Sequence, residues 1–378
     1  MKALRTILLA LATTMMFSCG DDNDGLEGGG NPAPGINEKS ILTLEFSRQV
    51  IQANGQDAAD FIVKVDGQPV TSGYTIYDQN DAPVSSASFT TTKPGEYSFW
   101  ATYKTLHSEN VVLKAISIPV PELPADPSPE KTEFQKKVLM SQFTGNRCPN
   151  CPRMTVVVRE VLAKQEMKDK VVMTSPHTYN SSDPGYLETP IASSFGIASY
   201  PTMLFDLALS KTYSYNFTAD WLTSMINSRY AVPATAGISA KSELITNAEG
   251  AKQIALHVAI KAAKEGNYRV GAWLLEDSIK AKQANVGIEG DFDTHNNVVR
   301  IADSKGVNNA KYSGVDLGII HAQKTAEHVF IMNLNPKWVE KNLHIAIFVT
   351  NKQEDGSLPV VNVIDCPIVC SLPFNYTK

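Results

Sequence analysis

The chain is 378 residues long, carries a formal net charge of −5 and contains 43% hydrophobic residues. This length and hydrophobic content suffice for two or three domains, each with its own core. The weakly acidic balance, with no Lys- or Arg-rich run in the sequence, excludes nucleic acid as an expected partner.

The first residues have the pattern of a secretory signal. Lys2 and Arg5 precede a short apolar run, "ILLALATTMMF", which is too short for a membrane-spanning helix. The run ends in "FSCG", so a cysteine stands where a small residue normally precedes cleavage. This pattern resembles a bacterial lipoprotein signal over residues 1–19, in which Cys19 is lipidated and becomes the mature N-terminus. The alternative is an ordinary signal peptide with an accidental cysteine.

Residues 20–38 have the composition of a flexible tether, beginning "GDDNDGLEGGGNPAPG". Their acidic cluster looks like the surface-export signal of lipoproteins from certain Gram-negative anaerobes. Acyl chains contribute about 0.8 kcal/mol per buried methylene, so a multiply acylated cysteine would hold the protein stably on a membrane. We therefore expect attachment to the cell outer membrane through the N-terminal lipid, with the protein facing the exterior. The periplasmic face is the alternative.

Residues 39–118 have the pattern of short β-strands separated by turns. The dipeptides "NG" and "DG" are typical of hairpins, and one side of "KPGEYSFWATY" is apolar with a period of two. These features predict an immunoglobulin-like β-sandwich. The prolines of "IPVPELPADPSPEK" then predict an extended, semi-rigid linker over residues 119–133.

The next segment predicts alternating strands and helices. "KKVLMSQF" and "DKVVMTSP" have strand composition, "RMTVVVREVLAKQEMK" has helical spacing, and "TADWLTSMINSRY" predicts a helix capped by Thr218. "FGIASYPT" puts Pro201, after Tyr200, at the mouth of a further strand, in a form that often carries a cis bond. This order predicts a thioredoxin-like domain over residues 134–231. Further strands predict a C-terminal β-sandwich over residues 232–378.

The expected fold class is therefore multidomain, α/β plus all-β, with a thioredoxin-like domain flanked by two β-sandwich domains. The segment "FTGNRCPNCP" carries the candidate catalytic pair of the middle domain.

A redox dithiol needs one ionised, accessible thiol and a second thiol close enough to close a disulfide. We expect Cys148 in the first turn of a helix, where the helix dipole stabilises a thiolate and Arg147 adds a positive charge. Cys151 would resolve the mixed disulfide. Pro149 suits the first helical turn, and Pro201 would shape a groove for the substrate chain.

The lipoprotein signal, "FTGNRCPNCP", "FGIASYPT" and "WLLED…DFDTHNNVVR" are similar to segments of the lipoproteins related to the 28-kilodalton outer membrane protein of Gram-negative anaerobes. The resemblance extends over most of residues 134–370. It implies a thioredoxin-like domain with an appended β-domain on the cell surface, and it implies no particular substrate.

The sequence departs from the thioredoxin pattern near the cysteines. Gln142 stands where thioredoxins usually hold a buried acid, Arg147 replaces the usual aromatic residue, and Pro-Asn separates the two cysteines. These departures favour the thiolate and a higher reduction potential, which suits the oxidation or isomerisation of disulfides.

Cys366 and Cys370, in "DCPIVC", form a second pair. In one extended strand their Cα atoms would lie about 13 Å apart, whereas a disulfide needs them within about 7 Å. A local bond therefore requires a turn at Pro367. A structural disulfide and a second dithiol that exchanges with Cys148–Cys151 are both open, since four cysteines allow three pairings.

No metal and no cofactor is expected. The two cysteine pairs lie far apart in the sequence, which disfavours a zinc site made of four thiolates. "DFDTHN" lacks the glycine and distal glutamate of a calcium-binding loop and is interpreted as a polar turn. His177 and Asp183, in the insertion "SPHTYNSSDPGYLETP", are candidates for the rim of the active site.

Two functions remain. In the first, the protein is an outer-membrane-anchored thiol–disulfide oxidoreductase that acts on the thiols of exported proteins. In the second, it is a non-catalytic surface binding or adhesion lipoprotein whose partner is a surface ligand and whose Cys-x-x-Cys is a structural disulfide. The Cys-x-x-Cys together with the proline loop favours the first.

Overall fold

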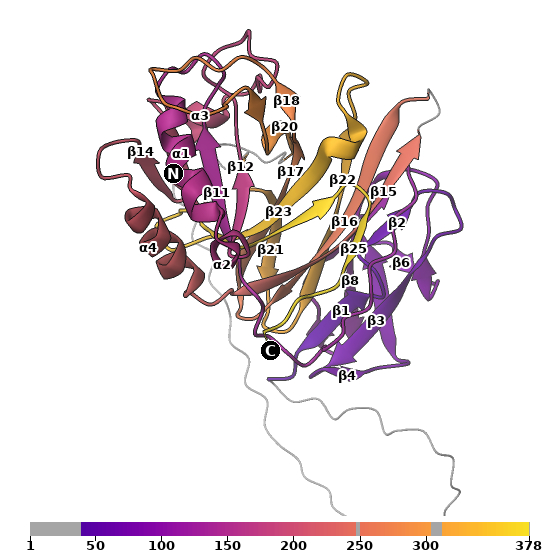
Figure 1. The fold of residues 1–378 in the computed structure, drawn as a ribbon. Coiled ribbons are helices and arrows are strands. Elements are labelled where there is room, and N and C mark those ends of the chain that lie inside the picture. Colours follow the sequence, from indigo (N-terminus) through magenta and orange to yellow (C-terminus); the bar gives the residue numbers. More distant parts are fainter. Residues whose placement is uncertain (1–38, 247–249, 304–311, 378) are drawn as a thin grey trace, which may run out of the picture.

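The computed structural model describes residues 39–246, 250–303 and 312–377. The expected signal and tether, including Cys19, lie outside the described residues. Strands account for 44% of the structure and helices for 11%, so the protein is predominantly β (Figure 1). The predicted fold class, with an α/β thioredoxin-like domain between two sandwiches, is therefore wrong. The predicted domain boundaries stay a prediction.

Residues 42–116 form two β-sheets around one core. One sheet has the order β1-β3-β4 with β7 beside β3, and the other has the order β2-β10-β8-β5-β6 with β9 beside β8. The strands are β1 Leu42–Phe46, β2 Val50–Gln52, β3 Ala59–Val65, β4 Gln68–Pro69, β5 Tyr74–Asp78, β6 Pro83–Val84, β7 Ser88–Phe89, β8 Gly95–Tyr103, β9 Leu106–His107 and β10 Val111–Ile116. In β8 the alternate residues Phe99, Ala101 and Tyr103 are buried, as the period of two predicts.

The rest of the described chain contains the helices and three larger sheets. The helices are α1 Cys151–Leu162, α2 Gln165–Lys168, α3 Ile191–Ser194, α4 Ala219–Tyr230 and the 3-10 helix η2 Glu340–Asn342. The strands are β11 Val138–Phe143, β12 Val171–Thr174, β13 Thr202–Phe205, β14 Leu209–Thr212, β15 Ala236–Thr246, β16 Lys252–Ala262, β17 Gly266–Glu276, β18 Ile279–Lys280, β19 Thr294–His295, β20 Val298–Asp303, β21 Val315–Ile320, β22 Thr325–Asn333, β23 Leu343–Asn351, β24 Val360–Pro367 and β25 Cys370–Leu372.

The larger sheets lie in layers. The sheet β12-β11-β13-β14 packs on the sheet β20-β17-β23-β24, in which β21 also pairs with β17. The second sheet packs in turn on the sheet β22-β16-β15-β25. The strands β11 and β12 are parallel, whereas β13 is antiparallel to β11. Figure 1 shows α1 and α4 on the outer side of the first of these sheets.

The middle layer is buried on both faces. In β17, Val270 and Leu274 face the outer sheet, whereas Trp273 faces β11 and β12. In β23, Ile347 faces the outer sheet and Phe348 faces β11 and β12. Strands that are buried on both faces consist of continuous apolar runs, and the segment "VGAWLL" of β17 is such a run.

The sheet beside the Cys-x-x-Cys has the two long helices α1 and α4 on one face, and in the described part of the chain only the short helix α3 contributes to the other. Val138 and Met140 of β11 pack on α1 and α4, whereas Leu139 and Phe143 share a core with Trp273. The α/β prediction assumed a self-contained domain around this sheet, but its second face is closed by strands from the C-terminal part of the chain. This packing is the physical reason for the correction.

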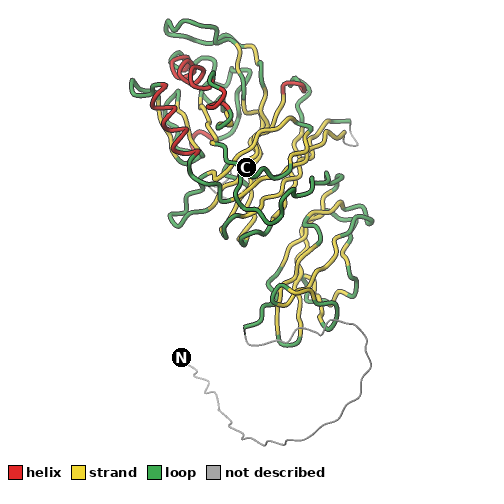
Figure 2. The backbone as a smooth tube through the Cα atoms, turned by 60° about the horizontal axis from the view of Figure 1, so that its bottom comes forward, coloured by secondary structure: helices red, strands yellow, loops and turns green. Residues whose placement is uncertain are grey.

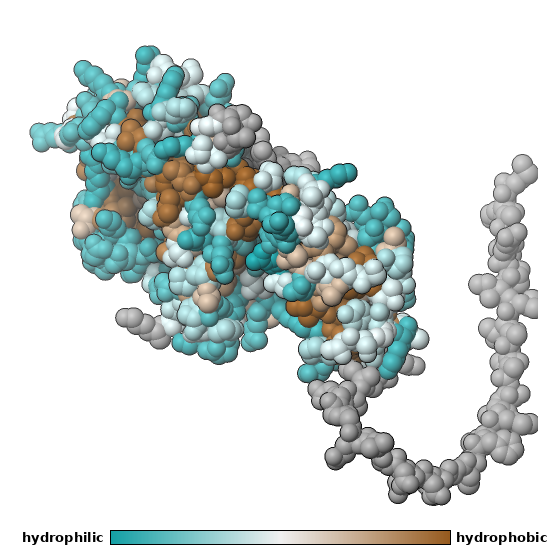
Figure 3. All heavy atoms as spheres, turned by 90° about the vertical axis from the view of Figure 1, so that its right-hand side faces the viewer, coloured by the Kyte–Doolittle hydropathy of each residue, from teal (hydrophilic) through white to brown (hydrophobic). Residues whose placement is uncertain are grey.

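The proline-rich linker lies against the C-terminal sheet. Lys261 of β16 is buried, and its ammonium group binds Asp126 at 2.9 Å. His257 Nδ1 contacts the carbonyl oxygen of Pro121 at 2.8 Å. A buried lysine is stable only when paired, so these contacts fix the linker and place the N-terminal sheets beside the larger body as a second lobe (Figures 2 and 3).

None of the helices in the described part of the chain is long and apolar enough to cross a membrane.

Candidate functional site

Cys148 and Cys151 are joined by a disulfide, with an S–S distance of 2.07 Å and a Cα–Cα distance of 5.4 Å. The helix α1 begins at Cys151, so Cys148 lies in the turn before the helix and not in its first turn. Pro152, rather than Pro149, occupies the first helical turn. Both cysteines are only 1% exposed, so the expected accessible Cys148 is buried in this structure.

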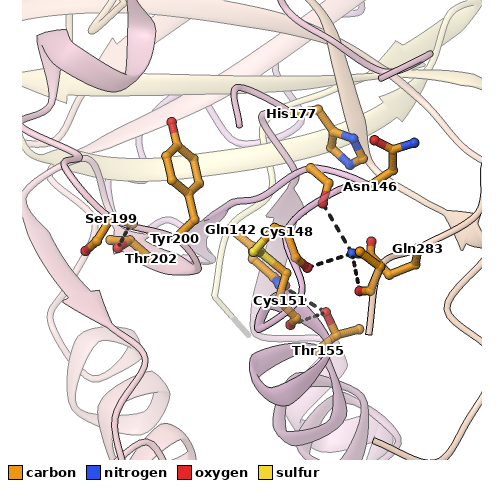
Figure 4. Close-up of a disulfide and its surroundings, with 12 residues drawn as sticks. Gln142, Asn146, Cys148, Cys151, Thr155, His177, Ser199, Tyr200, Thr202 and Gln283 are labelled. Atoms are coloured by element: carbon orange, nitrogen blue, oxygen red, sulfur yellow. Dashed lines mark hydrogen bonds between the residues drawn. A yellow bond between two sulfur atoms is a disulfide. The ribbon is translucent and has the colours of Figure 1, made fainter. Parts of the chain in front are cut away.

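Hydrogen bonds hold the turn and the start of the helix together. The amide of Cys148 donates to the carbonyl of Gly145 at 3.0 Å, and the amide of Cys151 donates to the carbonyl of Cys148 at 3.3 Å. Gln142 donates through Nε2 to the hydroxyl of Thr155 at 3.1 Å, and this hydroxyl donates to the carbonyl of Cys151 at 3.2 Å (Figure 4). Gln142 therefore supports α1 and offers no titratable group behind the disulfide.

A segment from the C-terminal part of the chain lies over the disulfide turn. We call residues 281–293, between β18 and β19, the covering segment. The amide of Ala284 donates to the carbonyl of Asn146 at 2.7 Å, and the amide of Val286 donates to that of Pro149 at 3.2 Å. Gln283 donates through Nε2 to the carbonyl of Cys148 at 2.9 Å (Figure 4).

The covering segment is attached to α1 at a second point. Arg159 donates to the carbonyl of Asp291 at 2.7 Å, and its guanidinium lies 5.0 Å from the ring centre of Phe292. A cavity of about 200 Å³ remains between α1 and the covering segment, with Gln142 and His295 among its lining residues. The sequence does not mark these covering residues as part of the site, because their contacts join segments far apart in the chain.

His177 and Asp183 are buried beneath the turn instead of lining a rim. His177 Nδ1 lies 2.8 Å from Asp183 Oδ2, which also accepts a hydrogen bond from the amide of Asn146 at 2.6 Å. The other carboxylate oxygen accepts from the amide of Gly185 at 2.7 Å. Burial opposes ionisation of Asp183, but the hydrogen bond and charge of His177, with the two amides, lower its pKa to about 2. The pair positions the loop before Cys148.

His295, on β19, packs edge to face against His177 at a centroid distance of 5.1 Å. Burial and the neighbouring charge of His177 lower the pKa of His295. The two rings therefore join the loop beneath the disulfide to the strand that follows the covering segment.

The acid sensitivity of the protein should report the anchoring role of Asp183. Its pKa is lower in the folded state than the ordinary value of 3.8, so its stabilising contribution is complete above about pH 4 and is lost as the pH falls towards 2. We expect the free energy of unfolding to fall more steeply over this range in the wild type than in Asp183→Asn. Urea titrations of both proteins at pH 7, 4 and 2.5 test this, and equal pH slopes would contradict it.

Tyr200 lies on the other side of the disulfide from Gln283 (Figure 4). The Tyr200–Pro201 bond is cis. A groove of about 450 Å³ is lined by these two residues together with Asn150, Arg153 and Tyr213. Thus a neighbouring groove is open while the disulfide itself is covered.

The remaining predicted site residues form none of the hydrogen bonds described above between the disulfide turn and the covering segment. Arg147 is exposed. Cys366 and Cys370 are free thiols on β24 and β25 and are not joined to Cys148 or Cys151. In residues 39–246, 250–303 and 312–377, no three His, Cys, Asp or Glu side chains are grouped so that they could hold a metal ion.

Comparison with known proteins gives a family match over part of the chain and a structural likeness. Residues 189–368 match the family described as Outer membrane protein Omp28, and this match indicates an outer membrane protein. The matched range begins after Cys151, so it contains Pro201 and the covering segment but not the disulfide. No curated protein matches the sequence.

The structure is similar to HBP35 of Porphyromonas gingivalis, with a TM-score of 0.51 and 18% sequence identity. The similarity covers 66% of this chain and 80% of that chain. At this identity the likeness concerns the fold alone.

Proposed function

We propose that the protein is an outer-membrane lipoprotein, anchored through Cys19 and facing the cell exterior, whose Cys148–Cys151 disulfide exchanges with the thiols of exported proteins. The observation that carries the proposal is the disulfide at the beginning of α1, directly beside the open groove at Pro201. The positive end of the helix dipole stabilises a thiolate at the first residue of α1, which makes Cys151 a suitable leaving group.

The exchange balances as follows in the oxidising direction. A substrate thiolate attacks Cys148 Sγ, the Cys148–Cys151 bond breaks, and Cys151 leaves as a thiolate. A second substrate thiolate attacks the substrate sulfur of the mixed disulfide and releases Cys148. The substrate gains a disulfide and loses two protons, and the protein is left with two reduced cysteines. In the reverse direction Cys148 is the nucleophile and Cys151 resolves the mixed disulfide.

Glutathione buffers of graded potential test the proposal on the chain that lacks residues 1–19. We expect a Cys148–Cys151 potential between about −230 and −120 mV, the range of exchange catalysts. With a reduced model peptide that carries two cysteines, we expect Cys148→Ser to abolish peptide oxidation. The Cys366→Ser/Cys370→Ser double variant, which keeps the first disulfide, should oxidise the peptide at the wild-type rate.

A structural disulfide is the second candidate, and the 1% exposure of both cysteines favours it. In that case the protein is a surface binding or adhesion lipoprotein, and its partner is a surface ligand. A disulfide that stays closed below about −300 mV, with no peptide oxidation, would establish this candidate and overturn exchange.

The anchor is tested separately in cells. We expect radiolabelled palmitate to enter the wild-type protein, and we expect Cys19→Ala to lose the label and the membrane fraction. Protease added to intact cells should degrade the wild-type protein if it faces the exterior. Label that persists in Cys19→Ala would exclude the lipid anchor, and protection from protease would indicate the periplasmic face.

A further inference from the structure

Cys366 and Cys370 are brought together where the chain passes from one C-terminal sheet to the other. Cys366 lies near the end of β24, opposite Ile345 of β23, whereas Cys370 begins β25, opposite Ser242 of β15. The chain thus turns between the two strands, so the cysteines do not have the spacing of one extended strand. Cys370 packs against the core cluster that contains Cys366.

The two thiols have different surroundings. Cys366 is 2% exposed and belongs to the core between the two sheets. Cys370 is half-buried on β25, which lies at the edge of its sheet. The amide of Cys370 donates to the Ser242 hydroxyl at 3.1 Å, and this hydroxyl donates to Cys370 Sγ at 3.2 Å. A reagent from solvent can therefore reach Cys370 more readily than Cys366.

The neighbouring groups favour ionisation of Cys370. The neighbouring Cys366 thiol outweighs the effect of burial and, with the Ser242 hydrogen bonds and the charge of Lys241, holds the pKa of Cys370 below its ordinary value. The same contact, burial and the charge of Asp365 raise the pKa of Cys366. Both shifts favour ionisation of Cys370, the more accessible sulfur, over Cys366.

We propose that Cys366 and Cys370 form a second, reversible dithiol–disulfide site, in which Cys370 attacks a low-molecular-weight disulfide and Cys366 closes an internal bond between the two sheets. The site is independent of the function proposed for Cys148–Cys151. It makes the contact between the C-terminal sheets responsive to oxidants.

The reaction balances with a small disulfide, RSSR, as the oxidant. The Cys370 thiolate attacks one sulfur, the S–S bond of RSSR breaks, and RS⁻ leaves. The RS⁻ takes the proton of Cys366, and the Cys366 thiolate then attacks Cys370 Sγ and releases a second RS⁻, which takes a proton from solvent. The two cysteines are oxidised to one disulfide, and RSSR is reduced to two RSH.

The reduced Cys148→Ser/Cys151→Ser chain, treated with oxidised glutathione, isolates this site. We expect an internal Cys366–Cys370 disulfide, located by peptide mass after the free thiols are trapped with N-ethylmaleimide. The added Cys366→Ser change should instead leave glutathione attached to Cys370. A chain that stays reduced in excess oxidised glutathione would overturn the proposal. So would faster attachment of glutathione to Cys366 in the matching Cys370→Ser protein than to Cys370 in the Cys366→Ser protein.

Ser242 provides a positioning test with a matched control. We expect the rate of Cys370 alkylation to rise with pH with a midpoint below that of an ordinary cysteine, and we expect Ser242→Ala to move this midpoint upward. Ser239 lies on the same strand and donates to the carbonyl of Leu372 at 3.0 Å, so Ser239→Ala should leave the midpoint unchanged. A wild-type midpoint near 8.5, the value of an ordinary cysteine, or equal shifts in both variants, would show that Ser242 does not tune the thiol.

Discussion

Replacing Phe348 with alanine is expected to lower the free energy of unfolding by about 3–5 kcal/mol, the usual cost of removing a fully buried aromatic ring. The Phe348 ring is 0% exposed and lies edge to face on Trp273 at 5.4 Å. It also covers Gly271, where it leaves no room for a Cβ atom. The collapse of neighbouring groups cannot readily fill such a cavity, because β-sheets close the layer on both sides.

The same variant tests whether the layers unfold together. Since Phe348 shares its core with β11, the strand before the disulfide turn, we expect one urea transition whether it is followed by circular dichroism or by the access of reductant to Cys148–Cys151. Ile319→Ala, on β21 of the same sheet but 66% exposed, should change stability by less than about 0.5 kcal/mol. The shared core would be contradicted by two separate transitions if Phe348→Ala shifted only the transition that does not expose the disulfide. Such a result would indicate independent domains.

Local patterns in the sequence predicted local structure well. The alternation in "KPGEYSFWATY" corresponds to buried Phe99, Ala101 and Tyr103. The predicted cap of the last helix is present, since Thr218 accepts a hydrogen bond from the amide of Trp221 at 3.2 Å. These features depend on neighbours within a few residues, which the sequence displays directly.

The fold class could not be read in the same way, because it depends on what covers each face. The strand–turn–helix order around Cys148 is real, but the partner of the second face of β11 comes from β17 and β23. A signal was present: "VGAWLL" is apolar on both sides, which indicates burial between two layers rather than one exposed face. The pattern shows that a second partner exists but does not identify it.

At the candidate site, too, local features were predictable from the sequence, whereas contacts between distant segments were not. The cysteine pair was evident from its spacing, whereas the covering segment uses backbone amides and the side chain of Gln283. A backbone amide is present at almost every residue, so nothing in "KAKQANVG" marks Ala284 or Val286 as partners of the disulfide turn. His177 and Asp183 were identified, but their burial beneath the turn was not.

Removing the side chain of Gln283 is expected to speed reduction of the Cys148–Cys151 disulfide about tenfold. Gln283 Nε2 donates to the carbonyls of Cys148 at 2.9 Å and Gly145 at 3.3 Å. A hydrogen bond contributes about 0.5–1.5 kcal/mol net, and a donor shared by two carbonyls belongs at the upper end of this range, close to the ~1.4 kcal/mol that corresponds to a factor of ten. If the disulfide reacts only when the covering segment moves away, a weaker attachment raises the population of the open state by that factor.

Pseudo-first-order reduction by dithiothreitol, with released thiols trapped at intervals, measures the effect. Gln283→Glu keeps the size of the side chain but has no N–H donors, so it should accelerate reduction at least as much as Gln283→Ala. Lys282→Ala, at the neighbouring exposed position, should leave the rate within twofold of the wild type. If all three variants react at the wild-type rate, the covering segment does not control access. If both Gln283 variants are faster in reduction and in peptide oxidation, the covering segment gates the exchange site, because the same opening limits both reactions.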